Sequence, residues 1–147
     1  MERYVKATRF FDADMVVRIT ADCPCIDPEI INELIEGMGE QDIYGLAGEF
    51  PDGLDCTIYK RSVLEDALKD PKSNKEHVGL GMKGGEYHKF KGLEHHRWTL
   101  DEPEDYEFLK IIFDNLGGDF STNDVLNYLE KNPININSHI IRNEGSQ

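Results

Sequence analysis

The chain has 147 residues, 39% of them hydrophobic and 31% charged, a composition typical of one globular domain with one core. Its formal net charge of −13 repels polyanions, which argues against nucleic acid as a partner. No apolar run approaches the roughly 20 residues that span a bilayer, and the N-terminal residues lack the apolar stretch of a secretory signal, so we expect a cytoplasmic protein with no membrane partner.

The first third of the sequence predicts a helix, a strand and a second helix. Residues 2–11 carry apolar side chains among polar neighbours and predict a short helix. The β-branched run Met15–Thr20 predicts a strand buried on both faces, as strands of parallel sheets are. Asp27 and Pro28 are the residue types preferred at the N-cap and the first position of a helix, and apolar positions extend this helix to about residue 38.

The middle of the sequence combines turn residues with shorter regular segments. A short strand is predicted for residues 42–47, and the turn Pro51–Gly53 leads into another strand through residue 58. Helices are predicted for residues 62–69 and 76–82, the second of which ends before Gly84 and Gly85.

The last third predicts one more strand and two helices. Glu94–Leu100 has the pattern of a strand, and Asp101 with Glu104 resembles a capping box. Helical periodicity then covers residues 106–116 and 121–129. Because strands alternate with helices, the sequence indicates one α/β domain with a mostly parallel sheet and flanking helices.

Two aspartates follow the ends of predicted strands. Asp22 follows Met15–Thr20, and Asp101 follows Glu94–Leu100. Ligands of α/β sheets bind beyond the carboxyl ends of the strands. Carboxylate oxygens suit Mg²⁺, which also takes substrate phosphates. The alternative is that Asp22 only ends a strand and Asp101 only caps a helix, and the pattern alone favours this alternative.

Other polar motifs have a structural interpretation beside a functional one. In "PDGLD", Asp52 and Asp55 could hydrogen-bond sugar hydroxyls, although the spacing favours a plain turn. "KEHVG" places Glu76 beside His77. "EHHRW" predicts two histidines on opposite faces of a strand, so that both cannot bind one metal ion.

The cysteines do not form a recognisable metal or disulfide framework. There are three, Cys23, Cys25 and Cys56, an odd number in a chain without a secretory signal. Cys23 and Cys25 are one residue apart, which is too close for a zinc knuckle, and no second pair follows. We expect reduced, partly buried thiols, with a redox pair or a zinc site as the less favoured interpretations.

Three segments in this order resemble a known family over nearly the whole chain. They are "VVRITADCPCIDPEIINELIE", "FPDGLDCTIYKRSVLEDA" with the following "KEHVG", and "RWTLDEPEDYEFLKIIFDNL". Together they resemble the cytidylyltransferase family of spore coat polysaccharide biosynthesis protein F, which is related to the acylneuraminate and 3-deoxy-manno-octulosonate cytidylyltransferases. Each motif is weak alone, and the ordered set is fairly specific.

The resemblance implies a nucleotide-diphospho-sugar transferase fold, a Rossmann-like α/β sheet, and synthesis of a sugar nucleotide. In such enzymes a sugar oxygen attacks the α-phosphorus of CTP and pyrophosphate leaves. Mg²⁺ binds between two aspartates that match Asp22 in "ADCP" and Asp101 in "LDEPED". The resemblance also implies substrate-binding positions, which match five residues here: Asp52, Asp55, Glu76, His77 and Arg97.

One family feature has no counterpart in this sequence. Family members begin with a strand and a basic, glycine-containing loop that holds the nucleotide triphosphate, and no such loop occurs here. The resemblance therefore implies an incomplete fold that corresponds to the C-terminal portion of the family domain, with weak or no activity in this chain alone. The strand Met15–Thr20 would then be an exposed edge that favours a homodimer. The alternative function is a non-catalytic, dimeric binding or structural module.

Overall fold

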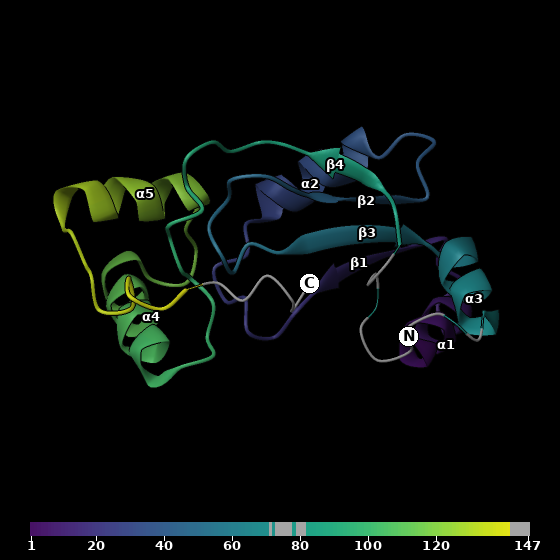
Figure 1. The fold of residues 1–147 in the computed structure, drawn as a ribbon, viewed down its shortest axis with the longest axis horizontal. Helices are drawn as coiled ribbons and strands as arrows, with labels where there is room; N and C mark the ends of the chain where they lie inside the picture. Colours follow the sequence, from purple (N-terminus) through teal and green to yellow (C-terminus); the bar gives the residue numbers. More distant parts are fainter. Residues whose placement is uncertain (71, 73–77, 79–81, 142–147) are drawn as a thin grey trace.

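The computed structural model of the chain describes residues 1–70, 72, 78 and 82–141. Helices and strands mix along these residues (Figure 1), which confirms the predicted α/β class. In chain order the elements are α1 (Glu2–Phe10), β1 (Met15–Ile19), α2 (Pro28–Gly37), β2 (Ile43–Leu46), β3 (Cys56–Lys60), α3 (Arg61–Lys69), β4 (Gly85–Tyr87), α4 (Pro103–Leu116) and α5 (Thr122–Lys131). Within the described residues, no helix is both long and apolar enough to cross a membrane.

The strands form a sheet in the order β1-β3-β2-β4. β3 runs antiparallel to both β1 and β2, whereas β2 and β4 are parallel. The expectation of a mostly parallel sheet is therefore wrong. β1, β2 and β4 all point the same way, but β3 lies between β1 and β2. It reverses direction because a loop, and not a crossover helix, joins β2 to β3.

The sheet separates two groups of buried apolar side chains. Successive side chains of a strand point to opposite faces, and Ile58 and Tyr59 of β3 accordingly lie in different clusters. Ile58 packs in the cluster that contains Leu34 of α2, and Tyr59 packs in the one that contains Leu64 of α3. α2 thus covers one face, and α1 and α3 lie together against the other (Figure 1).

β1 is an edge strand of the described sheet, where it pairs with β3 alone. Its side chains are half-buried or exposed, with Met15 at 44% and Ile19 at 39% exposure, so the prediction of burial on both faces is wrong. A strand at an edge has no neighbour to cover its second flank, which leaves these apolar side chains in solvent.

The segment predicted as a strand over Glu94–Leu100 is not part of the sheet. It has an isolated parallel bridge between Arg97 and Asp52, and it runs from the turn after β2 to the loop after β1. Three backbone bonds hold it there: Asp52 N to His96 O at 2.9 Å, Trp98 N to Asp52 O at 2.7 Å and Leu100 N to Asp22 O at 2.8 Å. The segment joins two loops and does not extend the sheet, so the prediction of a sheet strand here is wrong.

Several helix boundaries agree with the sequence, and others differ. Asp27 caps α2 and Pro28 is its first residue, as predicted. The capping box of α4 is formed by Glu102 and Asp105, one residue later than predicted. β4 was missed because its glycine-rich sequence has few strand formers. The helix predicted for residues 76–82 lies almost entirely outside the described residues.

One buried carboxylate joins the N-termini of two helices. Asp27 accepts a hydrogen bond from Glu29 N of α2 at 2.9 Å and another from Thr122 N of α5 at 2.8 Å. Helix N-termini carry unsatisfied N–H groups and partial positive charge, so a single anion stabilises both ends. Asp27 thereby fixes α5, and the α4–α5 end of the molecule, to the helix that follows β1.

We expect Asp27→Ala to lower the free energy of unfolding by about 3 kcal/mol, because two N–H groups lose their acceptor in a buried place. Ser121 caps only one helix, α5, where its side chain accepts a hydrogen bond from Asp124 N. Ser121→Ala should therefore lower the free energy of unfolding by only about 1 kcal/mol. Urea denaturation of both variants measures the difference. Equal losses in the two variants would show that Asp27 serves one helix and not two.

Candidate metal and substrate site

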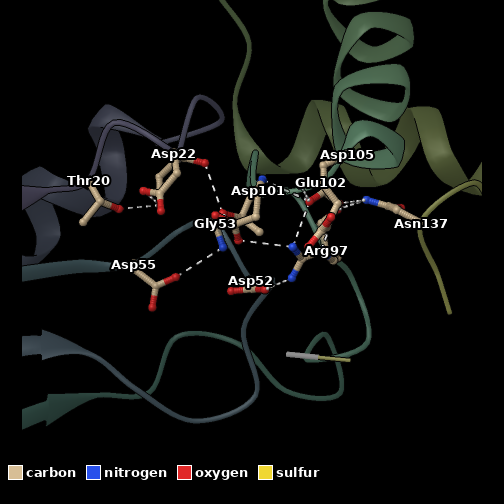
Figure 2. A network of polar contacts seen from close by, with 12 residues as sticks. Thr20, Asp22, Asp52, Gly53, Asp55, Arg97, Asp101, Glu102, Asp105 and Asn137 are labelled. Carbon is tan, nitrogen blue, oxygen red and sulfur yellow. Dashed lines mark hydrogen bonds and ion pairs between the residues drawn. The ribbon is translucent and has the colours of Figure 1, made fainter. Parts of the chain in front are cut away.

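Five aspartates from three parts of the chain lie in one region of polar contacts (Figure 2), and three of them bond Arg97. Asp22 comes from the loop after β1, and Asp52 and Asp55 come from the loop before β3. Asp101 and Asp105 lie at the start of α4. We call this group the aspartate cluster: Asp22, Asp52, Asp55, Asp101 and Asp105. All five candidate site residues of the sequence analysis that are described lie in or at this cluster.

The Arg97 guanidinium is the centre of the cluster. It forms a bidentate pair with Asp105, Nε to Oδ1 at 2.9 Å and Nη2 to Oδ2 at 2.8 Å. Its Nη1 donates to Asp52 Oδ2 at 3.0 Å, and its Nη2 donates to Asp101 Oδ2 at 3.2 Å. The planar guanidinium can bond three carboxylates at once because its N–H groups fan out in fixed directions.

Asp105 is the buried anchor of this network. Its side chain has 0% exposure, and that of Arg97 has 9%. Besides Arg97, its oxygens accept hydrogen bonds from Asn137 Nδ2 at 2.9 Å and from the backbone N–H groups of Asp101 and Glu102 at 3.1 and 3.0 Å. Both oxygens of the carboxylate are therefore fully used, which removes the main penalty for its burial.

The two aspartates predicted as metal ligands are joined through Thr99. The Thr99 hydroxyl lies 3.2 Å from Asp22 O and 3.4 Å from Asp101 Oδ2, and these two acceptors share its single hydrogen. Together with the bond from Leu100 N to Asp22 O, this places the two loops against each other. The Asp101 side chain is 52% exposed and Asp22 is half-buried, so both can be reached from solvent.

The turn "PDGLD" places its two acids in different environments. Asp52 faces Arg97, whereas Asp55 Oδ2 accepts a hydrogen bond at 3.2 Å from Gly53 N, two residues earlier in the chain. Gly53 has a φ of +100°, and a Cβ there would lie 2.5 Å from Thr99 N. Glycine at this position allows the turn to approach the 94–100 segment closely, which brings Asp52 to Arg97.

The hydrogen-bond network outweighs burial in its effect on the pKa of Asp105. Burial alone would raise the pKa of Asp105, but the hydrogen bonds from Arg97, Asn137 and the backbone lower it below its ordinary value. The bond to Asp105 is likewise the largest cause that raises the pKa of Arg97, against burial, which lowers it. Both groups are charged at neutral pH, and the aspartate cluster keeps an excess of negative charge that one arginine does not neutralise.

The chemistry of these donors fits a hard divalent cation that retains water. Asp22 and Asp101 offer carboxylate oxygens, and Mg²⁺ usually takes one or two carboxylates and completes its shell with water and substrate phosphates. In the part of the chain that the structure describes, no group of three or more histidine, cysteine, aspartate or glutamate side chains could hold a metal ion alone. A dedicated protein cage, as in structural zinc sites, is therefore absent from these residues.

The cysteines are free and buried, in agreement with the sequence analysis. Burial raises the pKa of the Cys23 thiol to about 11, that of Cys25 to about 12 and that of Cys56 to about 11. Raised pKa values favour protonated thiols at neutral pH, and a protonated thiol is a poor nucleophile. His95 and His96 do not lie on opposite faces of a strand, since their rings stack with centroids 4.1 Å apart.

The structure describes some of the predicted site residues and leaves two of them undescribed. Glu76 and His77 lie outside the described residues. Arg97 is bonded to three carboxylates, an arrangement suited to organising the cluster more than to binding a substrate anion. Asp105 and Asn137 were missed. A capping box placed one residue later would have found Asp105, whereas no local pattern marks Asn137.

Comparison with known proteins points to one family. No protein-family model matches the chain. It is 27% identical to the spore coat polysaccharide biosynthesis protein SpsF of Bacillus subtilis, over 90% of this chain and 62% of that protein. It is 28% identical to an uncharacterised protein of Methanocaldococcus jannaschii, over 95% of this chain and 64% of the other.

A solved structure agrees with these sequence similarities. A cytidylyltransferase from Leptospira borgpetersenii is 27% identical, with a TM-score of 0.81 over 97% of this chain and 66% of that one. The fold is therefore the Rossmann-like fold of a cytidylyltransferase, and the chain is related to the cytidylyltransferase family. The chain spans slightly less than two thirds of the length of each of these proteins.

The lowered pKa of Asp105 predicts a pH-dependent stability. A depressed carboxylate pKa stabilises the fold above the unfolded-state pKa of about 3.9, and this contribution is lost as the pH falls through the lower folded-state pKa. Asp105→Asn should lower the free energy of unfolding at pH 7 by about 3 kcal/mol, since Arg97 loses its buried partner. The difference from the unaltered chain should shrink below about pH 4. Urea denaturation from pH 7 to pH 2 measures it; a difference that stays constant over this range contradicts the account.

Proposed function

We propose that this chain takes part in nucleotidyl transfer, in which CTP and a sugar give a CMP-sugar for polysaccharide biosynthesis. The observation that carries the proposal is the meeting of the Asp22 loop with the Asp101 segment, through Thr99 and Leu100. The resemblance of the sequence to cytidylyltransferases implies a pair of metal ligands that matches these aspartates, which supports the proposal. The similarity to SpsF and to the Leptospira cytidylyltransferase supports the reaction class.

The reaction requires charge neutralisation more than covalent chemistry by the protein. A sugar oxygen forms a bond to the α-phosphorus of CTP, the bond from that phosphorus to pyrophosphate breaks, and the sugar hydroxyl gives up its proton to solvent water. Asp22 and Asp101 would hold Mg²⁺, which when bound offsets negative charge on the phosphoryl group. Asp52 and Asp55 lie beside this place and would accept hydrogen bonds from sugar hydroxyls.

We expect CTP with Mg²⁺ to raise the melting temperature of the chain by about 5 °C at saturating concentrations, because a ligand of the native state stabilises it. Asp101→Asn should abolish the shift that depends on Mg²⁺. The exposed Asp114 on α4 pairs with Lys110 far from the cluster, so Asp114→Asn is a control with the same change of charge. An equal shift in all three proteins would refute the assignment of the metal site.

Turnover by the 147-residue polypeptide itself should be weak. These 147 residues contain no counterpart of the basic, glycine-containing loop with which family members begin, so CTP would be bound largely through the cation. Pyrophosphate release from CTP with Mg²⁺ and a panel of acidic and neutral sugars measures this. Robust turnover with any of them would show that other residues of this chain hold the triphosphate.

The exposed edge of β1 favours a second, non-exclusive role as a dimeric module. Met15 and Ile19 are exposed on the same face of this edge strand. Antiparallel pairing with β1 of a second copy about Val17 would set Met15 of each chain opposite Ile19 of the other. We therefore propose a homodimer that associates through this edge.

Light scattering at micromolar concentration should report a dimer, and Ile19→Lys should shift it to a monomer, because a charge would then lie opposite Met15. Ile141 is 85% exposed and belongs to no strand of the sheet, so Ile141→Lys adds the same charge and should leave the dimer intact. A monomer in the unaltered chain, or a dimer that survives Ile19→Lys, contradicts association through this edge.

A further inference from the structure

Arg97 bonds an exposed and a buried aspartate of the aspartate cluster in different ways. Asp101 is half exposed and Asp105 is fully buried, yet the same Nη2 atom of Arg97 bonds both, at 3.2 and 2.8 Å. The buried pair is bidentate and the exposed one is not. The bidentate pair with Asp105 thus fixes the Arg97 side chain, and Arg97 in turn restrains the position of Asp101.

Asn137 completes the anchor from a distant part of the chain. Its Nδ2 group donates to the Arg97 carbonyl oxygen and to Asp105 Oδ1, each at 2.9 Å. The side chain is buried, with 4% exposure for the residue. One amide therefore fixes both the backbone of Arg97 and the carboxylate that holds its guanidinium, which leaves neither group free to reorient alone.

The position of Asp101 is set from the same source. The backbone N–H of Asp101 donates to Asp105 Oδ2 at 3.1 Å, and the Asp101 carboxylate accepts a hydrogen bond from Arg97 Nη2. Backbone and side chain of this exposed residue are thus both restrained by groups that end on Asp105. Removal of such supporting partners of a metal ligand typically weakens metal affinity by about 10- to 100-fold.

We propose that Asp105 and Asn137 are positioning residues of the cation site, which act through Arg97 to hold Asp101 in place. This inference rests on the proposed function, in which Asp22 and Asp101 hold the divalent cation. Asp105 and Asn137 do not touch the cation or the substrate. Their role is to keep the guanidinium fixed, so that its bond to the Asp101 carboxylate holds Asp101 in one orientation.

Mn²⁺ affinity of the 147-residue chain tests this inference without any need for turnover. Asp105→Glu and Asn137→Ala both leave the net charge unchanged, so a loss of affinity cannot be ascribed to a weaker field. Asp105→Glu keeps the carboxylate but displaces it, and Asn137→Ala removes the amide that orients it. We expect Asp105→Glu to weaken Mn²⁺ binding by about tenfold and Asn137→Ala to weaken it by a smaller but measurable factor.

The controls separate positioning from a general loss of stability. Leu64 is fully buried against α1 on the other side of the sheet, so Leu64→Ala destabilises the fold without touching the cluster. It should bind Mn²⁺ within twofold of the unaltered chain. The Arg97 Nε–H signal in ¹⁵N spectra gives a second measure: it should persist in Leu64→Ala and broaden by exchange with solvent in Asn137→Ala.

The outcomes of these measurements distinguish the positioning role from the cation site itself. If Asp101→Asn abolishes Mn²⁺ binding while Asp105→Glu and Asn137→Ala bind as tightly as the unaltered chain, the positioning role is refuted and the cation site stands. If the unaltered chain does not bind Mn²⁺, or Asp101→Asn leaves binding unchanged, the proposed site and this inference both fail. Should Asp105→Glu not fold, Asn137→Ala decides the question by itself.

Discussion

The ion pair between Arg97 and Asp105 is the interaction on which the candidate site depends. Both side chains are buried or nearly so, and transfer of two charges from water carries a large desolvation penalty. The penalty is offset because every oxygen of Asp105 has donors and the guanidinium has three carboxylate partners. Such a network adds little net stability compared with an apolar core, but it permits only one arrangement of the groups that it joins.

That arrangement connects segments far apart in the sequence. The Asp52 turn and the Asp22 loop are both bonded to the 94–100 segment, which reaches α4 through Asp101. Asp27 acts in the same way at the opposite side of the Asp22 loop, where it joins α2 to α5. The loop after β1 is therefore held by helices on one side and by the arginine network on the other, and Asp22 lies between them.

The sequence predicted the elements with strong local signals. The helix after Asp27–Pro28 and the helix that begins at Pro103 follow from capping residues and apolar periodicity. It failed where long-range pairing decides the outcome. Nothing local in residues 94–100 distinguishes a sheet strand from a segment that bridges two loops, and nothing in β3 reveals that it would lie between β1 and β2.

The same contrast holds for the site. Asp22 and Asp101 could be selected because both follow predicted strands, and Asp52, Asp55 and Arg97 followed from family resemblance, whereas Asn137 is 32 residues from the carboxylate that it bonds. A contact of that kind depends on how α5 returns the chain to α4. Sequence patterns describe one element at a time and do not contain this information.

We propose that a divalent cation binds between Asp22 and Asp101 while Arg97 stays paired with Asp105. A crystal structure of the chain grown with Mn²⁺, with anomalous data, tests it most directly. We expect an anomalous peak within coordination distance of both aspartates, with the Arg97–Asp105 pair intact. A peak elsewhere, no peak, or an Arg97 side chain that has left Asp105 for the ligands would contradict it.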